Sequence, residues 1–529
     1  MPANTKIMIK DSTGAIVPQS FDTVNDTWVA ASTVGSIQFP KRMRDNTGRL
    51  KVVEHQNIYD ADFEYGSQPL RWESFVVGGA TITSQPGAGG VRLRLSTAAG
   101  DVAIRQSRPY HRYQPGKTMY MATGTNLGAA SIGQRQRVGF FDDGNGLFIE
   151  QADPTPLNPY GMFVTYRTDV NGVPRDTRID ISQWSDPDGI KYLMNWSNMQ
   201  MIWMEYAWYG AGAVRWGVIK NGESFILHEI GFGDNPVLAQ QFPWARTGNL
   251  PVRYEQRNLT AQAATNDFYH YGVSVCVEGK IDEQRGFTYA PGMAPATPRR
   301  LVPLSTTRFP LLSFRYRVMG TQEYTQASAA ATAGSTTSLT VAGTPWTAGQ
   351  WVGRYVFFQG LGSSGQGVIA RITANTTNTL TFADNITGLA VATAPAAGQN
   401  YTIGIINRGQ LLPRTLLLSC DQAVTLELIS STTSSPVVLT GATFASLASL
   451  GSSQSFTERD VLATALTGGE VVYNAPAPAG ALQAYDLSNF FPLYNNIRGN
   501  QPDILTVAIS TAGVAANVGC SVVIQEAMS

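Results

Sequence analysis

Three tight turns constrain the fold of this chain more than any other feature of its sequence. Each turn joins two segments in which apolar and polar residues alternate. An Asn-Gly pair at 221–222 separates residues 214–220 from residues 223–230, and apolar and polar residues alternate on both sides. Asn-Gly supplies the two positive φ angles of a type I′ turn, whose twist matches that of the flanking strands. A second Asn-Gly pair lies at 171–172, and Asp-Gly-Asn-Gly at 143–146 forms a third turn. These hairpins predict an antiparallel β structure.

The segment 201–209, Met-Ile-Trp-Met-Glu-Tyr-Ala-Trp-Tyr, precedes the last of these hairpins. On a strand, the apolar side chains at 202, 204, 206 and 208 would share one face, and Trp203 would lie on the other. We therefore predict a central strand that is buried on both faces. No segment sustains a capped helical repeat over four turns, so helix is expected only as short turns near 190–199 and 457–466.

The 529 residues suggest two to four domains. We predict an all-β, multi-domain protein of antiparallel β-sandwich or jelly-roll modules with one small inserted β-barrel. The expected parts are a lead-in or attachment segment at 1–60 with a hairpin around 11–14, a sandwich at 61–275, a second sandwich at 276–320 plus 405–529, and the inserted module at 321–404. A Pro-rich stretch at 289–300 is expected to be a linker or an extended arm.

Charge is scarce and balanced in this sequence. Charged residues make up 14% of the chain, with 38 basic and 38 acidic residues, whereas soluble domains average about 25% charged residues. A surface poor in charge tends to be covered by neighbours, which favours a component of an assembly. A net charge of zero gives no positive field for nucleic acid or for an anionic membrane.

The cysteines and the first residues of the sequence indicate the compartment in which the chain folds. Cys276, Cys420 and Cys520 lie far apart in strand-like apolar segments, so we expect buried free thiols and no disulfide framework or metal site. The first residues form no secretory signal, and no apolar run is long enough to span a membrane. We expect folding in a cytosol without anchoring.

Residues that could carry chemistry are few. His55, His111, His228 and His270 form no local metal motif, so surface or structural roles are expected for all four. No Walker A loop, nucleophile elbow, dinucleotide fingerprint or CxxC pair is present, and the Gly-rich segment 360–367 is expected to be a turn between strands.

Two groups of carboxylates are candidates for a site. Asp60, Asp62 and Glu64 would share one face of a strand, and a solvated strand edge is favoured over a catalytic pair or a calcium loop, because the loop lacks its required Gly and Glu. Asp142 and Asp143 head a hairpin turn, where Asp is preferred for its local hydrogen bonds; the alternative is a lectin-type ion site.

The tryptophans of the expected inserted module also allow two interpretations. Trp346 and Trp351 could stack on sugars, but a place in the core of the module is favoured. No catalytic, cofactor-binding or metal-binding residue is therefore assigned from the sequence.

A set of segments occurs in a fixed order along the chain: Asp62–Glu73, Arg137–Phe148, Tyr209–Gly217, Thr247–Glu255, Phe309–Val318, 467–472 and 503–507. These segments resemble a family of virion structural proteins of tailed bacteriophages. The resemblance spans roughly residues 50–320 and 405–529, and residues 321–404 are similar to a small module of various phage tail proteins. It implies a tail, baseplate, fibre or adaptor subunit and transfers no catalytic residue. The hairpin region also resembles a concanavalin- or laminin-G-like jelly roll, at the level of fold alone.

The favoured hypothesis is a non-enzymatic structural component of a tailed phage particle, assembled in the host cytoplasm. Its partners would be other virion proteins and copies of itself, most usually in a trimer, because antiparallel modules pair their sheet edges with neighbours. Neither nucleic acid nor membrane insertion is expected. The alternatives are a receptor-binding protein that recognises host surface glycan, a capsid decoration protein, and a depolymerase that would depend on Asp60, Asp62 or Glu64.

Overall fold

The computed structural model divides the chain into two compact units, Met1–Val52 and Val53–Ser529. It describes residues 19–22, 27–30, 44, 51, 54–170, 172–233, 242–280, 286–293, 297–304, 308–326, 331–362, 367–431, 435–447, 455–490 and 492–527. In the first unit, β1 (Gln19–Asp22) and β2 (Thr27–Ala30) pair antiparallel. The hairpin expected around residues 11–14 lies outside the described residues.

The described residues are all-β, as predicted. The described helical elements are short 3-10 turns, η2 (Pro86–Ala88), η3 (Ile181–Gln183) and η4 (Lys191–Leu193). None of the helices in the described part is long and apolar enough to cross a membrane. The expected helical turn near 457–466 is wrong, because that segment contains β32 (Thr457–Asp460) and the start of β33 (Ala465–Thr467).

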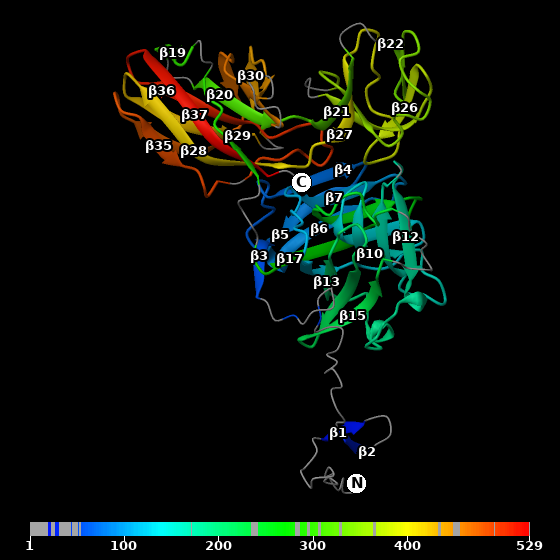
Figure 1. Cartoon of the computed structure of the whole chain (residues 1–529). Helices are drawn as coiled ribbons and strands as arrows, with labels where there is room; N and C mark the ends of the chain where they lie inside the picture. Colours follow the sequence, from blue (N-terminus) through cyan, green and yellow to red (C-terminus); the bar gives the residue numbers. More distant parts are fainter. Residues whose placement is uncertain are drawn as a thin grey trace. The chain divides into compact units, whose positions relative to one another are not determined.

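Two antiparallel sheets form the larger sandwich of the second unit, the jelly roll (Figure 1). The first sheet has seven strands in the order β12 (Arg175–Asp180), β11 (Met162–Thr168), β10 (Gly146–Ala152), β9 (Gln134–Phe141), β16 (Val252–Asn258), β7 (Val102–Ser107) and β4 (Trp72–Val77). The second has the order β15 (Glu223–Ile230), β14 (Val214–Lys220), β13 (Gln200–Tyr206), β8 (Met119–Asn126), β17 (Asn266–Glu278), β6 (Gly90–Leu95) and β5 (Thr81–Gln85), and β3 (His55–Ala61) pairs with β17.

The predicted hairpins set the register of these sheets. Lys220 pairs with Glu223 across the last turn, and both Asn221 (φ 54°) and Gly222 (φ 81°) have the positive φ that a type I′ turn requires. Strands β9 and β10 likewise pair across the turn at 142–145, and β11 pairs with β12 across the turn that contains Gly172. All three hairpins are confirmed.

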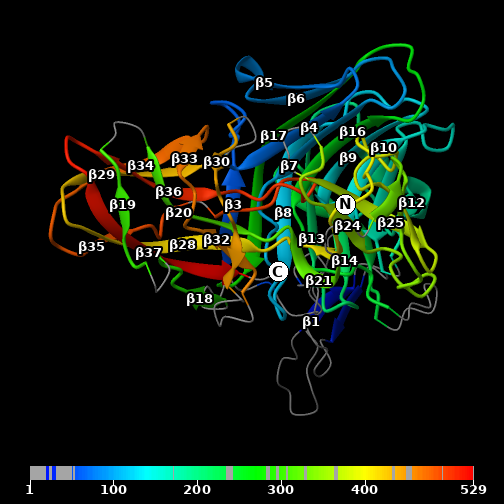
Figure 2. The same cartoon turned by 90° about the horizontal axis from the view of Figure 1, so that it is seen from above.

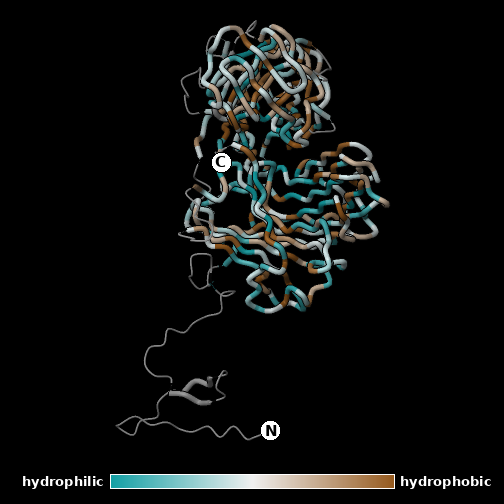
Figure 3. Tube along the Cα trace, turned by 90° about the vertical axis from the view of Figure 1, so that its right-hand side faces the viewer, coloured by the Kyte–Doolittle hydropathy of each residue, from teal (hydrophilic) through white to brown (hydrophobic). Residues whose placement is uncertain are grey.

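The core of the jelly roll lies between its two sheets, where inward-facing side chains of both sheets pack together. Strand β13 lies between β14 and β8, and residues 202–206 are all buried. Ile202 and Met204 face the core, while Trp203 packs with Ala122 and Ile226 on the other face. The predicted central strand is therefore confirmed, although Trp208 lies beyond its end. Hydrophobic and hydrophilic residues alternate along many strands (Figure 3).

A second sandwich, the C-terminal sandwich, is built from late strands and from segments that follow the jelly roll. One sheet has the order β18 (Phe287–Tyr289), β37 (Ala516–Ala527), β28 (Gln410–Cys420) and β35 (Gln483–Asp486), with β19 (Arg300–Val302) also on β37. The other has the order β31 (Ala445–Ser446), β32, β20 (Phe309–Tyr316), β36 (Leu505–Thr511), β29 (Val424–Ser430) and β34 (Glu470–Ala477). A separate pair joins β30 (Val438–Thr440) to β33.

The Pro-rich stretch 289–300 follows this sandwich closely. Strands β18 and β19, at its two ends, both pair with β37, and Gly292 forms an isolated bridge to Ser521. Strands β37 and β28 pair along ten positions, and both views show the two strands side by side (Figure 1 and Figure 2). The described part of the stretch therefore packs on a sheet as an extended segment.

The inserted module is a single antiparallel sheet of seven strands. Their order is β21 (Met319–Gln326), β27 (Tyr401–Ile406), β24 (Tyr355–Phe358), β25 (Val368–Asn375), β26 (Thr379–Asp384), β23 (Ser338–Val341) and β22 (Ala331–Gly334). The described pairings run as an open path from β21 to β22, so they do not close the barrel that the sequence predicted. Trp346 and Trp351 are 4% and 6% exposed and lie in the core of this module, as favoured.

The outer side of the seven-stranded sheet, which faces away from the core of the jelly roll, is covered by later parts of the same unit. Val102 and Ile104 of β7 form a buried cluster with Ile386, which follows β26, and with Ile497, which precedes β36. Arg257 of β16 donates to the Ile386 carbonyl at 3.1 Å. This packing brings the inserted module and the C-terminal sandwich onto one face of the jelly roll.

Candidate functional site

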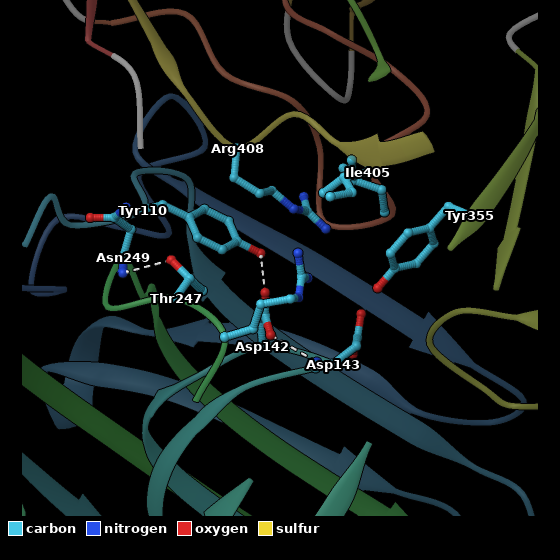
Figure 4. Close-up of a pocket in the computed structure, with 11 residues that line it drawn as sticks. Tyr110, Asp142, Asp143, Thr247, Asn249, Tyr355, Ile405 and Arg408 are labelled. Carbon is cyan, nitrogen blue, oxygen red and sulfur yellow. Dashed lines mark hydrogen bonds between the residues drawn. The ribbon is translucent and has the colours of Figure 1, made fainter. Parts of the chain in front are cut away.

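A cavity of about 230 Å3, the Asp142 cavity, lies between the turn that joins β9 to β10 and the inserted module. Asp142 and Asp143 line it from the turn, and Thr247 and Asn249 line it from the segment before β16. Tyr355 of β24 lies across from them, with Ile405 of β27 and with Arg408 just after that strand (Figure 4).

The two carboxylates of this turn are held by partners within the chain. Asp142 Oδ1 accepts the backbone N–H groups of Gly144 and Asn145, both at 2.8 Å, and the Tyr110 hydroxyl donates to its Oδ2 at 3.2 Å. Asp143 forms an ion pair with Arg253 at 2.7 Å. The expected role of Asp in the turn is confirmed for Asp142, because its carboxylate caps the turn's own amides.

A buried carboxylate behind the turn joins three parts of the chain. Asp169 accepts hydrogen bonds from Arg246 Nε and Nη2 at 2.9 and 3.0 Å and from Asn145 Nδ2 at 2.8 Å, and Arg371 of β25 lies 3.6 Å away. Burial opposes the ionisation of Asp169, but Arg246 and Arg371 hold its pKa below the ordinary value. The carboxylate therefore stays charged and fixes the inserted module to the jelly roll.

The opposite wall carries a tyrosine and a second arginine. Arg371 donates to the Tyr355 hydroxyl, and burial raises the pKa of Tyr355 to about 12. The Arg408 guanidinium lies 4.9 Å from the centre of the Tyr110 ring and donates to the carbonyls of Asn496 and Ile497 at 2.9 and 3.0 Å. Arg408 is thus engaged in a contact between modules, whereas Tyr355 is bonded to Arg371 within the inserted module.

Next to the cavity lies the charged face, the set of paired charges on the outer side of the seven-stranded sheet. Because β10, β9 and β16 are neighbours, Glu150, Arg137 and Glu255 lie directly opposite one another. Arg137 pairs with Glu150 at 2.5 Å and with Glu255 at 3.0 Å, and both carboxylates are fully buried. The charged face also includes the pairs of Arg178 with Glu150, Arg257 with Glu255, and Arg167 with Asp176.

The arginines set the charge state of this face. Burial alone would raise the pKa of Glu255, but Arg257, Arg137 and Arg253 hold it well below the ordinary value. A second cavity of about 440 Å3 adjoins the face and shares Asp143 with the first. Its carboxylates are engaged in ion pairs within the chain, so the arrangement supports fixed, neutralised charge better than proton transfer, which needs a group poised near the working pH.

One of the four histidines is exposed, and the other three are buried. His55 is exposed on β3. His270 of β17 is fully buried and stacks on Tyr254 with ring centres 4.0 Å apart, and His228 of β15 accepts the Ser185 N–H at 2.9 Å through Nδ1. Burial lowers the pKa of His228 to about 4 and that of His111, also beside Arg71, to about 3. Burial also lowers the pKa of His270 well below the ordinary value, so all three buried histidines are neutral near pH 7.

The acidic group at 60–64 does not share a strand. β3 ends at Ala61, so that only Asp60 lies on it, and Asp62 and Glu64 follow in the loop and turn after it. All three residues are exposed. Among the described residues, no group of three or more His, Cys, Asp or Glu side chains gathers where a metal ion could bind.

The three cysteines form no disulfide. Cys420 and Cys520 are buried, as expected, whereas Cys276 is half-buried. The Gly-rich segment 360–367 lies between β24 and β25, and its residues 363–366 lie outside the described part. None of these residues lines the Asp142 cavity.

The charged face was not predicted as a site, although the sequence contains a signal for it. Arg253, Glu255 and Arg257 alternate along one strand, and Arg135 and Arg137 alternate along another. Charges at every second position of a strand whose other side is apolar place a charged stripe on one side of the sheet. Which charges meet depends on the pairing of β9 with β16, and these strands are far apart in the sequence.

No protein-family model matches this chain, and no curated protein matches it. Part of the fold is similar to solved structures. A glycosyl hydrolase family 16 protein from Mycobacterium smegmatis is 10% identical, with 42% of this chain and 100% of that chain covered and a TM-score of 0.29. A beta-1,3-glucanase from Mycobacterium marinum has the same identity and TM-score over 42% and 98%. A cellulose induced protein is 15% identical over 41% and 96%, with a TM-score of 0.27. Likeness at this level gives no information on activity.

Proposed function

We propose that this protein is a non-enzymatic structural component of a tailed phage particle, as a tail, baseplate, fibre or adaptor subunit. It would act through contacts with other virion proteins and with copies of itself, most simply in a trimer. The proposal rests on the segments that resemble virion proteins and on the way in which the modules of the second unit are bonded together.

The observation that carries the proposal is the set of buried polar bonds between modules. Arg108, after β7, forms a buried ion pair with Asp503, just before β36. The Ile497 N–H donates to Glu73 of β4 at 2.8 Å, and Asp169 binds Arg371 of the inserted module. Buried charge pairs need matched geometry and are costly to break. Modules joined in this way would move as one body, which suits a load-bearing subunit.

The chemistry of the surface supports the same proposal. With 14% charged residues and no net charge, the chain has little electrostatic reason to remain monomeric. Strands such as β15 and β22 end their sheets in the described pairings, and such edges are places where a neighbouring subunit can pair.

Immunogold electron microscopy of purified particles, with antibody raised against the full chain, tests the proposal. Gold at the tail tip or along appendages is the expected result. Gold spread over the capsid would replace the tail assignment by a capsid decoration protein. Unlabelled particles in a lysate that is rich in the protein would overturn the structural role.

A further inference from the structure

A larger cavity lies where β3 and the segment after β7 meet the C-terminal sandwich, and arginines line its wall. Its volume is about 780 Å3, which falls within the range of about 300–1,000 Å3 for ligand pockets. Arg71, Arg112 and Arg414 line it, and no Asp or Glu is among the described residues of its wall. We name it the arginine cavity.

Two of these arginines are held by neutral groups. The Arg71 guanidinium lies 4.6 Å from the centre of the Tyr59 ring and donates to the Asp60 carbonyl. Arg414 donates from Nε and Nη2 to Gln525 Oε1, at 3.0 and 2.5 Å. These contacts orient the guanidinium groups without cancelling their charge. His111 also lines the wall, and because burial and Arg71 lower its pKa to about 3, it adds no charge near pH 7.

The rest of the wall is rich in groups that both donate and accept hydrogen bonds. Gln56, Asn57 and Asn489 contribute amides, Ser488 a hydroxyl, and Tyr494 a phenol. The Tyr494 side chain is buried and lines the cavity. Sugar hydroxyls need the same mixture of donors and acceptors that amides and hydroxyls offer.

We propose that the arginine cavity binds a saccharide that carries carboxylate groups. Guanidinium groups recognise carboxylates through paired hydrogen bonds, and the amides and hydroxyls of the wall would bind the sugar hydroxyls. A single-stranded nucleic acid fits less well, because Tyr59 and Tyr494 are 7% and 6% exposed and offer little open ring face for base stacking. The inference goes beyond the structural role and does not depend on it.

Isothermal titration calorimetry of the full chain with a short oligogalacturonate tests the proposal. The acidic oligomer should bind, and a neutral galactose oligomer of the same length should bind at least about tenfold more weakly, because one lost charged contact is worth roughly that factor. Equal binding of the two oligomers, or no binding of the acidic one, would overturn it. Displacement of the oligomer by inorganic phosphate at equal concentration would mean that the cavity binds free anions and not the saccharide as such, which would also overturn the proposal.

Substitutions in the wall of the arginine cavity test whether the oligogalacturonate binds there. Arg71→Gln and Arg414→Gln should each weaken oligogalacturonate binding by about tenfold or more. Arg308→Gln is the matched control, because it removes the same charge from a residue that does not line the cavity. Asn489→Trp keeps the arginines and changes an exposed side chain of the wall, so it should hinder binding without unfolding the protein. Unchanged affinity in all three cavity variants would contradict the proposal, whatever the gold labelling finds.

Discussion

The charged face of the jelly roll and the arginine cavity both gather arginines, but they treat the positive charge in opposite ways. On the charged face, Arg137 lies between two fully buried carboxylates, and Arg257 and Arg167 each have an acidic partner. In the arginine cavity, Arg71 and Arg414 bind a carbonyl and an amide. On the charged face, the arginines form ion pairs with carboxylates of the same chain. In the arginine cavity, Arg71 and Arg414 are bonded to neutral groups, so their positive charge is available to an anionic ligand.

We therefore expect the arginines of the charged face to act on folding stability and those of the arginine cavity to act on ligand binding. A buried charge without its partner carries a large desolvation penalty, so each member of the charged face depends on the others. A guanidinium at the wall of an open cavity keeps contact with water and loses little when its neighbours change. Substitutions of the same kind should therefore act mainly on folding in one region and mainly on binding in the other.

The largest effect is expected for Arg137→Gln. The change leaves Glu150 and Glu255 buried with one partner fewer each, and we expect the free energy of unfolding to fall by about 3–5 kcal/mol. Urea unfolding followed by tryptophan fluorescence measures it in the jelly roll, which contains Trp72, Trp203 and Trp216. Arg354→Gln is the control, since its pair with Glu323 is exposed and is worth about 1 kcal/mol or less. An equal loss of unfolding free energy in the two variants would mean that the buried ion pairs of the charged face matter no more for folding than an exposed pair.

A smaller, pH-dependent effect is expected at Asp176. Burial opposes its ionisation, but Arg167 outweighs burial and lowers the pKa to about 2. An unfolded Asp has a pKa of about 3.9, so the unfolded chain takes up the proton first as the pH falls. The stability that ionised Asp176 contributes is thus complete above about pH 5 and is lost progressively as the pH falls through 4 and past 2, by about 2.5 kcal/mol in all.

The comparison of the parent protein with Asp176→Asn isolates this contribution from other acidic groups. The difference in unfolding free energy between the two proteins should shrink as the pH is lowered from about 4 to about 2. A difference that stays constant over this interval would mean that Arg167 does not control the ionisation of Asp176. The described wall of the arginine cavity has no carboxylate, so it should add nothing to this slope.

Local signals account for what could be predicted from the sequence. The turn at Asn221 and Gly222 and the buried strand β13 follow from neighbouring residues alone, because a type I′ turn and a period of two are properties of short segments. The short 3-10 turn η4 lies within the segment 190–199 where helix was expected. The resemblance to virion proteins, by contrast, stays a prediction.

Features that depend on distant pairing could not be predicted in the same way. The segment from Thr457 to Asp460 becomes a strand because it pairs with Ser313–Tyr316 of β20, and that pairing outweighs its local tendency. Closure of the inserted sheet depends on whether β21 meets β22, which no local pattern encodes. Both cavities are walled by segments that lie far apart along the chain, so their residues carry no common motif.

The smallest effect on folding is expected for Arg414→Gln, the counterpart of Arg137→Gln in the arginine cavity. The side chain is half-buried, and its partner Gln525 is uncharged, so the change strands no buried carboxylate. We expect the free energy of unfolding to change by less than about 1 kcal/mol. Hydrogen exchange of the β28 and β37 amides measures this locally, because these strands carry Arg414 and Gln525. Faster exchange by a factor of a hundred or more, about 2.7 kcal/mol, would make Arg414 a structural residue. Unchanged exchange together with weakened oligogalacturonate binding would leave recognition as its role.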